Sequence, residues 1–487
     1  MLLIFIMHKD VIVVGAGISG IAAGYNLKKS CPNKSFSILE GRKSIGGTWD
    51  LFKYPGIRSD SDMHTLGFRF KPWIHDKSIA DGPSIMEYLH ETINEYELNN
   101  NILLDHKVDS ANWNSERLLW ELKIKVNDQI QNLTCNFLFL CGGYYSYTKP
   151  HMPYFKNQES FEGQIVHPQF WDESLNYSEK KVAVIGSGAT AITIVPAIAE
   201  KAEHVVMIQR SPTYVVSGPS KDAINRFLRR VLPIRITYFL IRWKNILYQS
   251  FTFFMARKYP ERTKNRILDL AKNEISTDDV NQHFTPSYKP WDQRICLIPD
   301  SDLFNAINNK KASVVTDTIN EFQPDGILLN SGKKIEADII ITATGIELNS
   351  LNDINVTIDN VKVIANERLT YKGMMLSGVP NFAISFGYVN ASWTLRADLT
   401  CEYVCRLINL MDKKGVKCCE PKDDKSAYGD DQLIDFTSGY FQRGLNQMPK
   451  QGNKAPWKNY QNYLKDIFAV RLMSIDDTNL KFSKLKD

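Results

Sequence analysis

The sequence is short of cysteine. Its 487 residues include eight cysteines and no C-x-x-C pair, because Cys401 and Cys405 are four positions apart and Cys418 and Cys419 are adjacent. This pattern excludes a disulfide scaffold and a zinc ribbon, and no metal site is expected. It also predicts a reducing, intracellular compartment, which we take to be the cytoplasm.

Long apolar runs are also missing. The longest uncharged stretch, residues 373–395, is long enough to span a membrane but is interrupted by Gly378, Pro380 and Asn390. A spanning helix is therefore not expected. Hydrophobic residues make up 43% of the chain and charged residues 23%, a balance that excludes disordered and low-complexity proteins. A chain roughly three times the ~150 residues of an average domain predicts two or three domains.

Charge is unevenly distributed. Residues 221–270 hold twelve Lys and Arg against three acids, a net charge of +9, whereas the whole chain carries +5. Apolar and aromatic residues recur through this block at mixed helical spacing, so we expect a basic helical insertion over about residues 217–280, broken or kinked at Pro233. The block predicts weak peripheral association with an anionic membrane surface, such as the inner face of the cell membrane. A cap over a substrate tunnel or a dimer contact fits it equally well. No nucleic-acid partner is expected.

One pattern occurs twice: an apolar strand, a glycine-rich turn, a small-residue helix and a second strand. The first copy comprises strand 10–14, turn 15–20, a helix to about residue 29 and strand 35–39; the second comprises strand 181–185, turn 186–191, a helix to about residue 201 and strand 205–209. Each copy is a βαβ unit of the dinucleotide-binding type. Two such units predict two bound nucleotides.

The expected fold class is α/β, with two nested Rossmann-like dinucleotide-binding domains and a helical insertion. Strands at 137–140 and 338–342 each end in a small-residue turn and flank the second unit. We therefore predict a discontinuous first domain, residues 1–155 plus 336–487, and a nested second domain, residues 156–335, that includes the basic insertion.

The first glycine-rich turn follows the pattern G-x-G-x-x-G at Gly15, Gly17 and Gly20. Gly15 allows a tight turn, Gly17 lets a pyrophosphate approach the backbone, and Gly20 lets helix and strand pack closely. Glu40 lies twenty residues after Gly20, at the end of the next strand, where a carboxylate can accept from both ribose hydroxyls. Adenine dinucleotide binding is favoured over a purely structural glycine turn.

The second unit has Arg210 and Ser211 at the place where the first has an acid. A carboxylate there would repel a 2′-phosphate, whereas a guanidinium and a hydroxyl bind it through charge-assisted bonds worth about 1.5 to 3 kcal/mol. NADPH is thus favoured over NADH. The alternative is that Arg210 is a solvated charge at a strand end.

Two further segments combine glycine and aromatic residues. Residues 46–60 read G-G-x-W-x(4)-Y-P-G-x(3)-D, which is typical of an ordered loop beside a large flat ligand, although a packed loop without chemistry has the same composition. Residues 161–171 read F-x-G-x-x-x-H-x-x-x-W, just before the second unit. The histidine of this segment, His167, is expected to be structural more often than catalytic.

Together with the two fingerprints, these segments resemble the signature of type I Baeyer–Villiger flavin monooxygenases. Within that family, residues 47–62, 288–294 and 390–395 are most similar to the ethionamide-activating monooxygenases. The likeness covers nearly the whole chain. Asp172 follows the signature tryptophan where the family often has proline, which does not alter the resemblance.

The resemblance implies two cofactors and a set of site residues. FAD is expected at Gly15, Gly17, Ser19, Gly20, Glu40, Gly47, Thr48, Trp49, Asp50, Leu51, Asp60 and the backbone near Val108. NADPH is expected at Gly186, Ser187, Gly188, Ala189, Thr190, Ala191, Ile192, Arg210 and Ser211, with Arg58 and Ser59 on the nicotinamide side. Arg294 matches the family's active-site arginine, and Asp60 is expected to orient it. Gln293 replaces a lysine that often precedes this arginine, which puts a second cation for the 2′-phosphate in doubt.

The implied reaction is NADPH-dependent oxygenation. FAD reduced by NADPH reacts with O2 to give a C4a-peroxyflavin, which inserts one oxygen atom into ketones to form esters or lactones and also oxidises sulfides or thioamides. A sulfur- or nitrogen-oxidising flavin monooxygenase without a physiological ketone substrate is the alternative. A flavoprotein disulfide reductase needs a redox cysteine pair, but only Cys31 follows the first fingerprint closely. A non-catalytic membrane-binding protein would leave both nucleotide sites unexplained.

Overall fold

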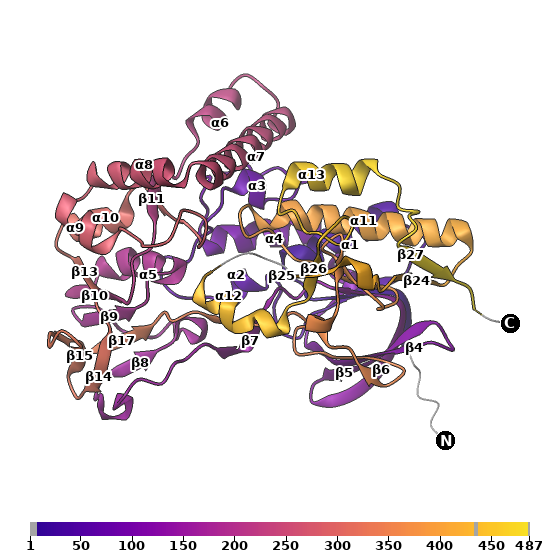
Figure 1. Ribbon diagram of the computed structural model, residues 1–487, viewed down its shortest axis with the longest axis horizontal. Coiled ribbons are helices and arrows are strands. Elements are labelled where there is room, and N and C mark those ends of the chain that lie inside the picture. The colour runs from indigo at the N-terminus through magenta and orange to yellow at the C-terminus, as the bar shows by residue number, and fades with distance from the viewer. Residues whose placement is uncertain (1–6, 433–436, 486–487) are drawn as a thin grey trace.

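The chain folds into two sheet-based units joined by a two-stranded ribbon (Figure 1). The computed structural model describes residues 7–432 and 437–485. Both expected βαβ units are present, and the expected α/β architecture with paired Rossmann-like units is confirmed.

The larger sheet contains the first fingerprint. Its nine strands run in the order β20-β19-β4-β5-β6-β1-β2-β3, with β23 paired to β6. The centre is parallel, with Val14 of β1 opposite Leu39 of β2 and Leu140 of β6, and its apolar strands are buried on both faces. The strands are β1 (Met7–Val14), β2 (Phe36–Leu39), β3 (Ile102–Leu103), β4 (His106–Asn114), β5 (Leu119–Val126), β6 (Gln129–Leu140), β19 (Asn355–Ile358), β20 (Val361–Lys362) and β23 (Phe382–Ile384).

Helices from both ends of the chain cover this sheet. The fingerprint helix α1 (Ile18–Ser30) packs beside α11 (Trp393–Lys414), and α4 (Gly82–Glu95) lies next to α1. The α1–α11 contact is long-range in sequence and almost entirely buried, so the C-terminal part of the chain completes the core around the first βαβ unit.

The second sheet is smaller and wholly parallel. Its order is β13-β10-β9-β17-β8, and the fingerprint helix α5 (Ala189–Ala199) packs against it. The strands are β8 (Gln164–Val166), β9 (Lys181–Ile185), β10 (His204–Gln209), β13 (Ala312–Thr316) and β17 (Ile339–Thr342); a hairpin layer of β14 (Ile319–Gln323), β15 (Gly326–Leu329) and β16 (Lys334–Glu336) follows β13.

The chain between the predicted domain boundary at residue 336 and residue 342 includes strand β17 of the second sheet. Strand β17 pairs with both β9 and β8, so residues 339–342 belong to the second sheet and the chain leaves it only after Thr342. The crossing segments β7 (Tyr145–Pro150) and β18 (Ile346–Leu348) then pair with each other. The last strand of a nested domain can pair between two earlier strands of its sheet, as β17 does between β9 and β8. An apolar stretch of sequence does not show which sheet such a strand joins.

The basic insertion forms four helices, of which α6 and α7 project from the rest of the molecule while α8 and α9 lie against the second unit (Figure 1). They are α6 (Ala223–Leu228), α7 (Ile234–Lys258), α8 (Pro260–Lys272) and α9 (Thr277–His283). Pro233 precedes α7 and separates it from α6, as expected. The described residues 7–432 and 437–485 include no helix that is long and apolar enough to cross a membrane.

Buried polar contacts hold α7 against the first unit. Arg242 donates to the carbonyls of His64 (2.8 Å) and Gly67 (2.7 Å) beside α3 (Met63–Leu66) and pairs with Asp398 of α11 at 3.2 Å. Both charged side chains are buried, with 4% and 3% exposed. The insertion is therefore anchored to the first unit, although in sequence it belongs to the second unit.

The C-terminal segment returns to the junction between the sheets. Helix α12 (Gly439–Gly444) packs against β18 so closely that a Cβ on Gly444 would lie 2.4 Å from Cβ of Leu348. Further on are α13 (Tyr463–Ile467) and the ribbon of β24 (Cys418–Pro421) with β27 (Leu480–Ser483). In Figure 1, α12 is the yellow helix between the two sheets.

Candidate functional site

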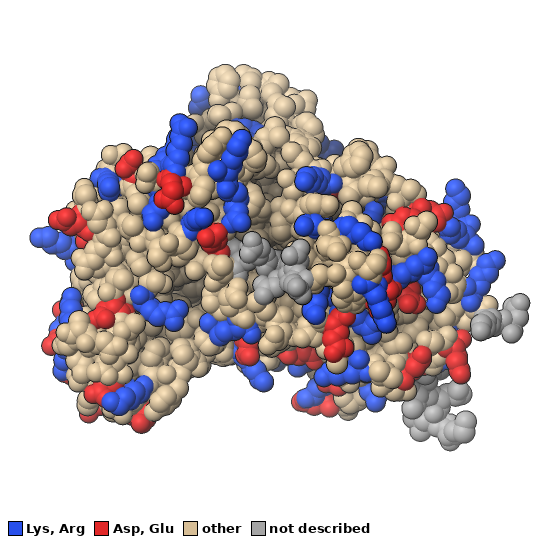
Figure 2. Space-filling view, in the orientation of Figure 1, with Lys and Arg blue, Asp and Glu red and all other residues tan. Residues whose placement is uncertain are grey.

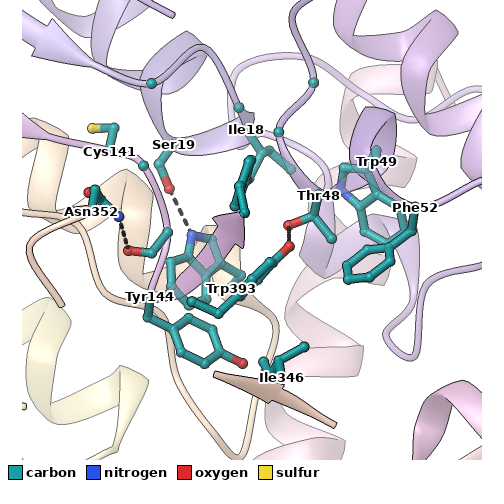
Figure 3. Close-up of a pocket in the computed structure, with 18 of the residues that line it drawn as sticks. Ile18, Ser19, Thr48, Trp49, Phe52, Cys141, Tyr144, Ile346, Asn352 and Trp393 are labelled. Atoms are coloured by element: carbon teal, nitrogen blue, oxygen red, sulfur yellow. Dashed lines mark hydrogen bonds between the residues drawn. The ribbon is translucent and has the colours of Figure 1, made fainter. Parts of the chain in front are cut away.

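A cavity of about 500 Å³ lies where the two units meet. Figure 3 shows part of its wall, with side chains from both halves of the chain pointing inward. The predicted site residues that line it are Gly15, Gly17, Ser19, Glu40, Gly47, Thr48, Trp49, Arg58, Ser59, Asp60, Val108, Ala189, Thr190, Ile192 and Arg294. Gly20, Asp50, Leu51, Gly186, Ser187, Gly188, Ala191, Arg210 and Ser211 are not among the residues that line it.

The first glycine turn forms a backbone cradle. Gly15 has φ 98°, and a Cβ there would lie 2.9 Å from the Cys141 carbonyl oxygen. A Cβ on Gly20 would lie 1.8 Å from the Gly15 oxygen, so Gly20 serves close packing. A Cβ on Gly17 would face Gly47 at 3.5 Å. The two facing glycines leave backbone at the cavity that a pyrophosphate can approach, which fits FAD.

Glu40 is held in place by backbone donors. Its carboxylate accepts from the N–H of Ala16 at 2.8 Å and of Arg42 at 3.0 Å. Burial raises the pKa of Glu40, which the two N–H donors and the Arg42 charge oppose. Each oxygen can accept a further hydrogen bond, and Glu40 lines the cavity, so the carboxylate is able to accept from ribose hydroxyls.

Arg42 is a cavity residue that the sequence did not single out. It pairs with Asp50 at 2.6 Å and donates to the Gly47 carbonyl at 3.2 Å, so it ties the strand end to the glycine loop. Asp50, predicted to bind cofactor directly, contacts Arg42 and Ser44. It acts on the cavity through Arg42. A cation two residues after Glu40, the acid predicted to bind ribose, was the available signal.

An aromatic wall faces the first fingerprint (Figure 3). Tyr144 stacks on Trp393 with ring centroids 5.3 Å apart, and the Trp393 indole donates to the Ser19 hydroxyl at 2.7 Å. On the other side, the hydroxyls of Thr48 and Tyr145 are 2.6 Å apart. This flat, hydrogen-bonded wall suits a flat ring ligand. The aromatics directly after the Cys141–Gly143 turn were a signal for it.

Arg294 and Asp60 form an ion pair inside the cavity. Arg294 precedes strand β12 (Cys296–Pro299), whereas Asp60 ends the glycine- and aromatic-rich loop. The Asp60 charge, more than any other cause, raises the pKa of Arg294. Their side chains are 35% and 39% exposed, so both reach the cavity space. The predicted pair is therefore assembled, and its guanidinium is a cation held in a fixed position.

The same loop joins the two units. Arg58 pairs with Asp302 of α10 (Asp302–Asn308), and its second terminal nitrogen, Nη2, is buried without a partner among the described residues. The Ser59 hydroxyl donates to the Ser61 carbonyl at 2.6 Å. A Cβ on Gly56 would lie 2.7 Å from Ala197 of α5. The unpaired Nη2 of Arg58 can therefore donate a hydrogen bond to a polar group of a ligand in the cavity.

The second fingerprint is only partly inside the cavity. A Cβ on Gly186 would lie 2.4 Å from the Ala343 oxygen, whereas one on Gly188 would meet nothing within 4 Å. The Ser187 hydroxyl donates to the Ser211 carbonyl at 3.1 Å. Arg210 is exposed and makes no hydrogen bond or ion pair with any residue that the structure describes. An open glycine turn beside an unpaired guanidinium fits a dinucleotide with a 2′-phosphate.

His167 lies away from the cavity lining. Its Nδ1 accepts from the N–H of Gln169 at 3.1 Å, and burial lowers its pKa to about 4. The ring is therefore neutral at physiological pH and caps the short helix at 168–170, in line with a structural role.

Two family models match the chain. Residues 72–391 match a flavin-binding monooxygenase-like family, and residues 13–76 match an NAD(P)-binding Rossmann-like domain.

Relatives of known name match over nearly the full length. The chain is 50% identical over 479 residues to the FAD-containing monooxygenase EthA of Mycobacterium tuberculosis, covering 98% of both chains. It is 46% identical over 483 residues to the probable FAD-binding monooxygenase AlmA of Acinetobacter baylyi, covering 99% of this chain and 97% of that one.

Solved structures share the fold at lower identity. An oxidized steroid monooxygenase bound to NADP has a TM-score of 0.79 at 21% identity, covering 98% of this chain and 100% of that one. The OTEMO complex with FAD and NADP has a TM-score of 0.77 at 20% identity, covering 98% and 99%.

Proposed function

Since the chain belongs to the flavin-binding monooxygenase-like family, we propose that it is an FAD- and NADPH-dependent monooxygenase that inserts one oxygen atom into ketones and also oxidises sulfur compounds. Relatives that are named FAD-containing monooxygenases and structural neighbours bound to FAD and NADP support this cofactor pair. The observation that carries the ketone assignment is the ion pair of Arg294 and Asp60 in the cavity.

The residues of the first unit would hold FAD. Gly15, Gly17 and the N-terminus of α1 would face the pyrophosphate, and Glu40 would accept from the ribose. The stacked Tyr144 and Trp393 would lie along the ring system. Bound FAD, once reduced by NADPH, supplies the oxygen-activating chemistry.

Arg294 would stabilise negative charge at the reacting centre. When a nucleophile adds to a ketone carbonyl, the carbonyl oxygen becomes an anion, and a preorganised cation lowers the energy of that state. Asp60 holds the guanidinium in one orientation and balances its charge before an anion arrives. Oxygen transfer to a sulfide creates no comparable anion on the acceptor, so it depends less on Arg294.

The two acceptor classes are separated by one experiment. The holoenzyme is given a panel of ketones and sulfides while NADPH consumption and product mass are followed together. We expect ketone products and sulfide products that are each heavier by one oxygen atom. Oxidised sulfides or amines with no ester or lactone from any ketone would favour the sulfur- or nitrogen-oxidising alternative. NADPH consumption without any oxygenated product would refute the monooxygenase proposal.

We also propose that the helical insertion binds an anionic membrane surface weakly. On α7 and α6, Phe239, Phe251 and Phe227 are about 60% exposed, and Arg226 and Arg230 lie exposed beside them. In Figure 2 the projecting part of the molecule is largely uncharged, with lysine and arginine at its flanks. Exposed aromatics next to basic charge are typical of an interfacial helix, and the +9 charge of residues 221–270 complements anionic lipid.

Vesicle sedimentation tests this surface. The protein is mixed at low salt with phosphatidylcholine vesicles or with vesicles that also contain phosphatidylserine, and we expect binding to the anionic vesicles only. The double variant Phe239→Ser, Phe251→Ser should lose that binding and keep its oxygenase activity. Equal recovery with both vesicle types, or concentration-dependent dimers that disappear in the double variant, would contradict the membrane assignment.

A further inference from the structure

We propose that Arg443 of α12 and Arg210 of β10's C-terminal turn together form the binding site for the 2′-phosphate of NADPH. The inference rests on the proposed use of NADPH and names a second cation that neither the motifs nor the relatives assign. Gln293 leaves the chain without the lysine that the resemblance would place before Arg294. A different cation from the C-terminal segment would take its place.

The backbone brings the two arginines to the same edge of the second sheet. Arg210 directly follows β10, which ends at Gln209. A Cβ on Gly345 would lie 3.4 Å from Nη2 of Arg443, so this guanidinium lies over the turn that follows β17. Strands β10 and β17 flank β9 on either side. The cations therefore approach the carboxyl edge of the parallel strands, where dinucleotides bind in folds of this type.

Helix α12 is fixed in this place by packing. Gly444 has no room for a side chain against Leu348 of β18, and β18 is the segment by which the chain leaves the second sheet. Figure 1 shows α12 between the two sheets, on the side of β17. Arg443 thus reaches the nucleotide side of the second unit from a docked helix and not from a free chain end.

The two guanidinium groups lie at the same edge of the second sheet and repel each other. Burial and then the positive charge of Arg210 lower the pKa of Arg443, and Glu347 opposes this only in part. Neither arginine makes an ion pair with any residue in the part of the chain that the structure describes. Like charges held together without a counterion are unfavourable, so the pair is suited to an anion that binds between them.

A phosphate monoester has the matching charge. It carries about −1.5 to −2 at pH 7 and presents three acceptor oxygens, so two guanidinium groups can each donate two hydrogen bonds to it. The 2′-phosphate is the group by which NADPH differs from NADH. Binding of the 2′-phosphate between Arg210 and Arg443 would thus favour NADPH over NADH. It would not raise the affinity for dinucleotides in general.

The same helix also reaches the reaction centre. Tyr440, three residues before Arg443, lies near enough to Arg294 and Tyr144 to shift their pKa values upward. A phosphate that fixes Arg443 would hold Tyr440 beside Arg294. Coenzyme recognition and the arrangement of the cavity would then depend on one short helix.

Binding of two small probes to the FAD-loaded protein tests the inference without relying on activity. Calorimetry compares 2′,5′-ADP, which carries the 2′-phosphate, with 5′-AMP, which lacks it. We expect Arg443→Ala and Arg210→Ala each to weaken 2′,5′-ADP binding by about tenfold or more and to leave 5′-AMP binding unchanged. The double variant should no longer distinguish the two probes. Arg443→Lys, which keeps the charge, should retain part of the preference.

The matched control is Arg262→Ala, an exposed arginine of α8, which should bind both probes like the parent. An Arg443→Ala variant with parent-like affinity for 2′,5′-ADP would overturn the inference while the NADPH proposal stands. Equal weakening of both probes would overturn it as well, because α12 would then act only through structure. A parent protein that binds 2′,5′-ADP no more tightly than 5′-AMP would refute the NADPH proposal itself and this site with it.

Discussion

Arg294 donates a hydrogen bond to the carboxylate of Asp60, a residue 234 positions earlier in the chain. The pair joins the loop that follows the first fingerprint to the strand that follows the insertion, and both side chains line the cavity. The guanidinium of Arg294 is charged at neutral pH, as in any arginine, and Asp60 raises its pKa further. The wall of the cavity thus contains a permanent cation whose position is set by two distant segments.

Replacing Arg294 with alanine should abolish ketone oxygenation while FAD stays bound and reducible by NADPH. Gly15, Gly17 and Glu40, the residues proposed to bind FAD, lie elsewhere in the chain, so FAD binding should be spared. The anion that forms when a nucleophile adds to the ketone carbonyl loses its nearest positive charge. Loss of such a partner typically slows a reaction by about a hundredfold to a thousandfold. Stopped-flow absorbance follows flavin reduction, and product analysis follows ester formation. Sulfide oxidation is the internal control and should fall less; near-parental ester formation would show that Arg294 is a bystander.

Replacing Asp60 with asparagine should have a smaller effect than the loss of Arg294. The amide oxygen can still accept from the guanidinium, but the charge that balances Arg294 is gone, so the arginine is held less firmly. We expect a fall in kcat for ketones of roughly tenfold, with little change in FAD content. Asp60→Ala, which removes the hydrogen bond as well, should be slower still. If both variants match the parent, Asp60 does not position Arg294.

Much of the site could be predicted because its parts are local in sequence. Gly15, Gly17 and Glu40 belong to one βαβ unit, and their spacing alone places them at the end of one strand pair. The family resemblance drawn from these motifs is confirmed by relatives of 50% and 46% identity over nearly the whole chain. The loop at 46–60, predicted to lie beside a ligand, does line the cavity.

What could not be predicted depends on contacts between distant segments. Trp393 reaches Ser19 from α11, 374 residues further on, and its indole has no periodicity that distinguishes it from a core tryptophan. Strand β17 joins the second sheet beyond the predicted boundary at 336, because strand pairing is decided by the sheet and not by the strand's own sequence. Arg443 belongs to no recognisable sequence motif. Only the structure shows that it lies where the charge of Arg210 acts on it.

Alanine substitutions at Gly17 and Gly20 of the first fingerprint should affect FAD binding and stability differently. A Cβ on Gly17 meets Gly47 at 3.5 Å, an ordinary contact, whereas one on Gly20 would lie 1.8 Å from the Gly15 oxygen. Gly17→Ala should therefore fold with a near-parental melting temperature as apoprotein but retain little FAD, because the added methyl group occupies the approach of the pyrophosphate. Flavin absorbance per protein and thermal melting of the apoprotein measure the two effects.

Gly20→Ala should instead be unstable with or without flavin. Backbone must move to admit its methyl group, which costs several kcal/mol in a tightly packed core, on the order of 1 to 3 or more. Gly188→Ala serves as a control for the general effect of adding a methyl group at the start of a fingerprint helix, since Gly188 has φ −80° and a Cβ there meets nothing within 4 Å. Loss of flavin from Gly20→Ala with an unchanged melting temperature would contradict the packing role.

The buried pair of Arg242 and Asp398 should control how firmly α7 is attached. Arg242→Met leaves a carboxylate buried without its cation, and breaking such a pair costs about 3 to 5 kcal/mol. Arg117→Met, which breaks an exposed pair with Glu121, should cost only about 0 to 1 kcal/mol and is the matched control. The double variant Arg242→Met, Asp398→Leu should recover much of the loss, because no buried charge remains.

The cost of Arg242→Met should grow with pH. Burial raises the pKa of Asp398 to about 6 even beside Arg242, above its value of about 3.9 in an unfolded chain. Below pH 4 the carboxyl is therefore neutral in both states, and the variant lacks only the hydrogen bonds of Arg242. Between pH 4 and pH 6 the folded parent and the folded variant both hold a proton that the unfolded chain has released, so both lose stability alike. Above pH 6 the parent's carboxyl ionises beside Arg242, whereas in the variant it must either ionise unpaired or keep the proton, and both destabilise the folded variant. Melting temperatures of the variant and the parent should thus diverge above about pH 6; a constant difference from pH 5 to pH 8 would show that Asp398 is not the group left unpaired.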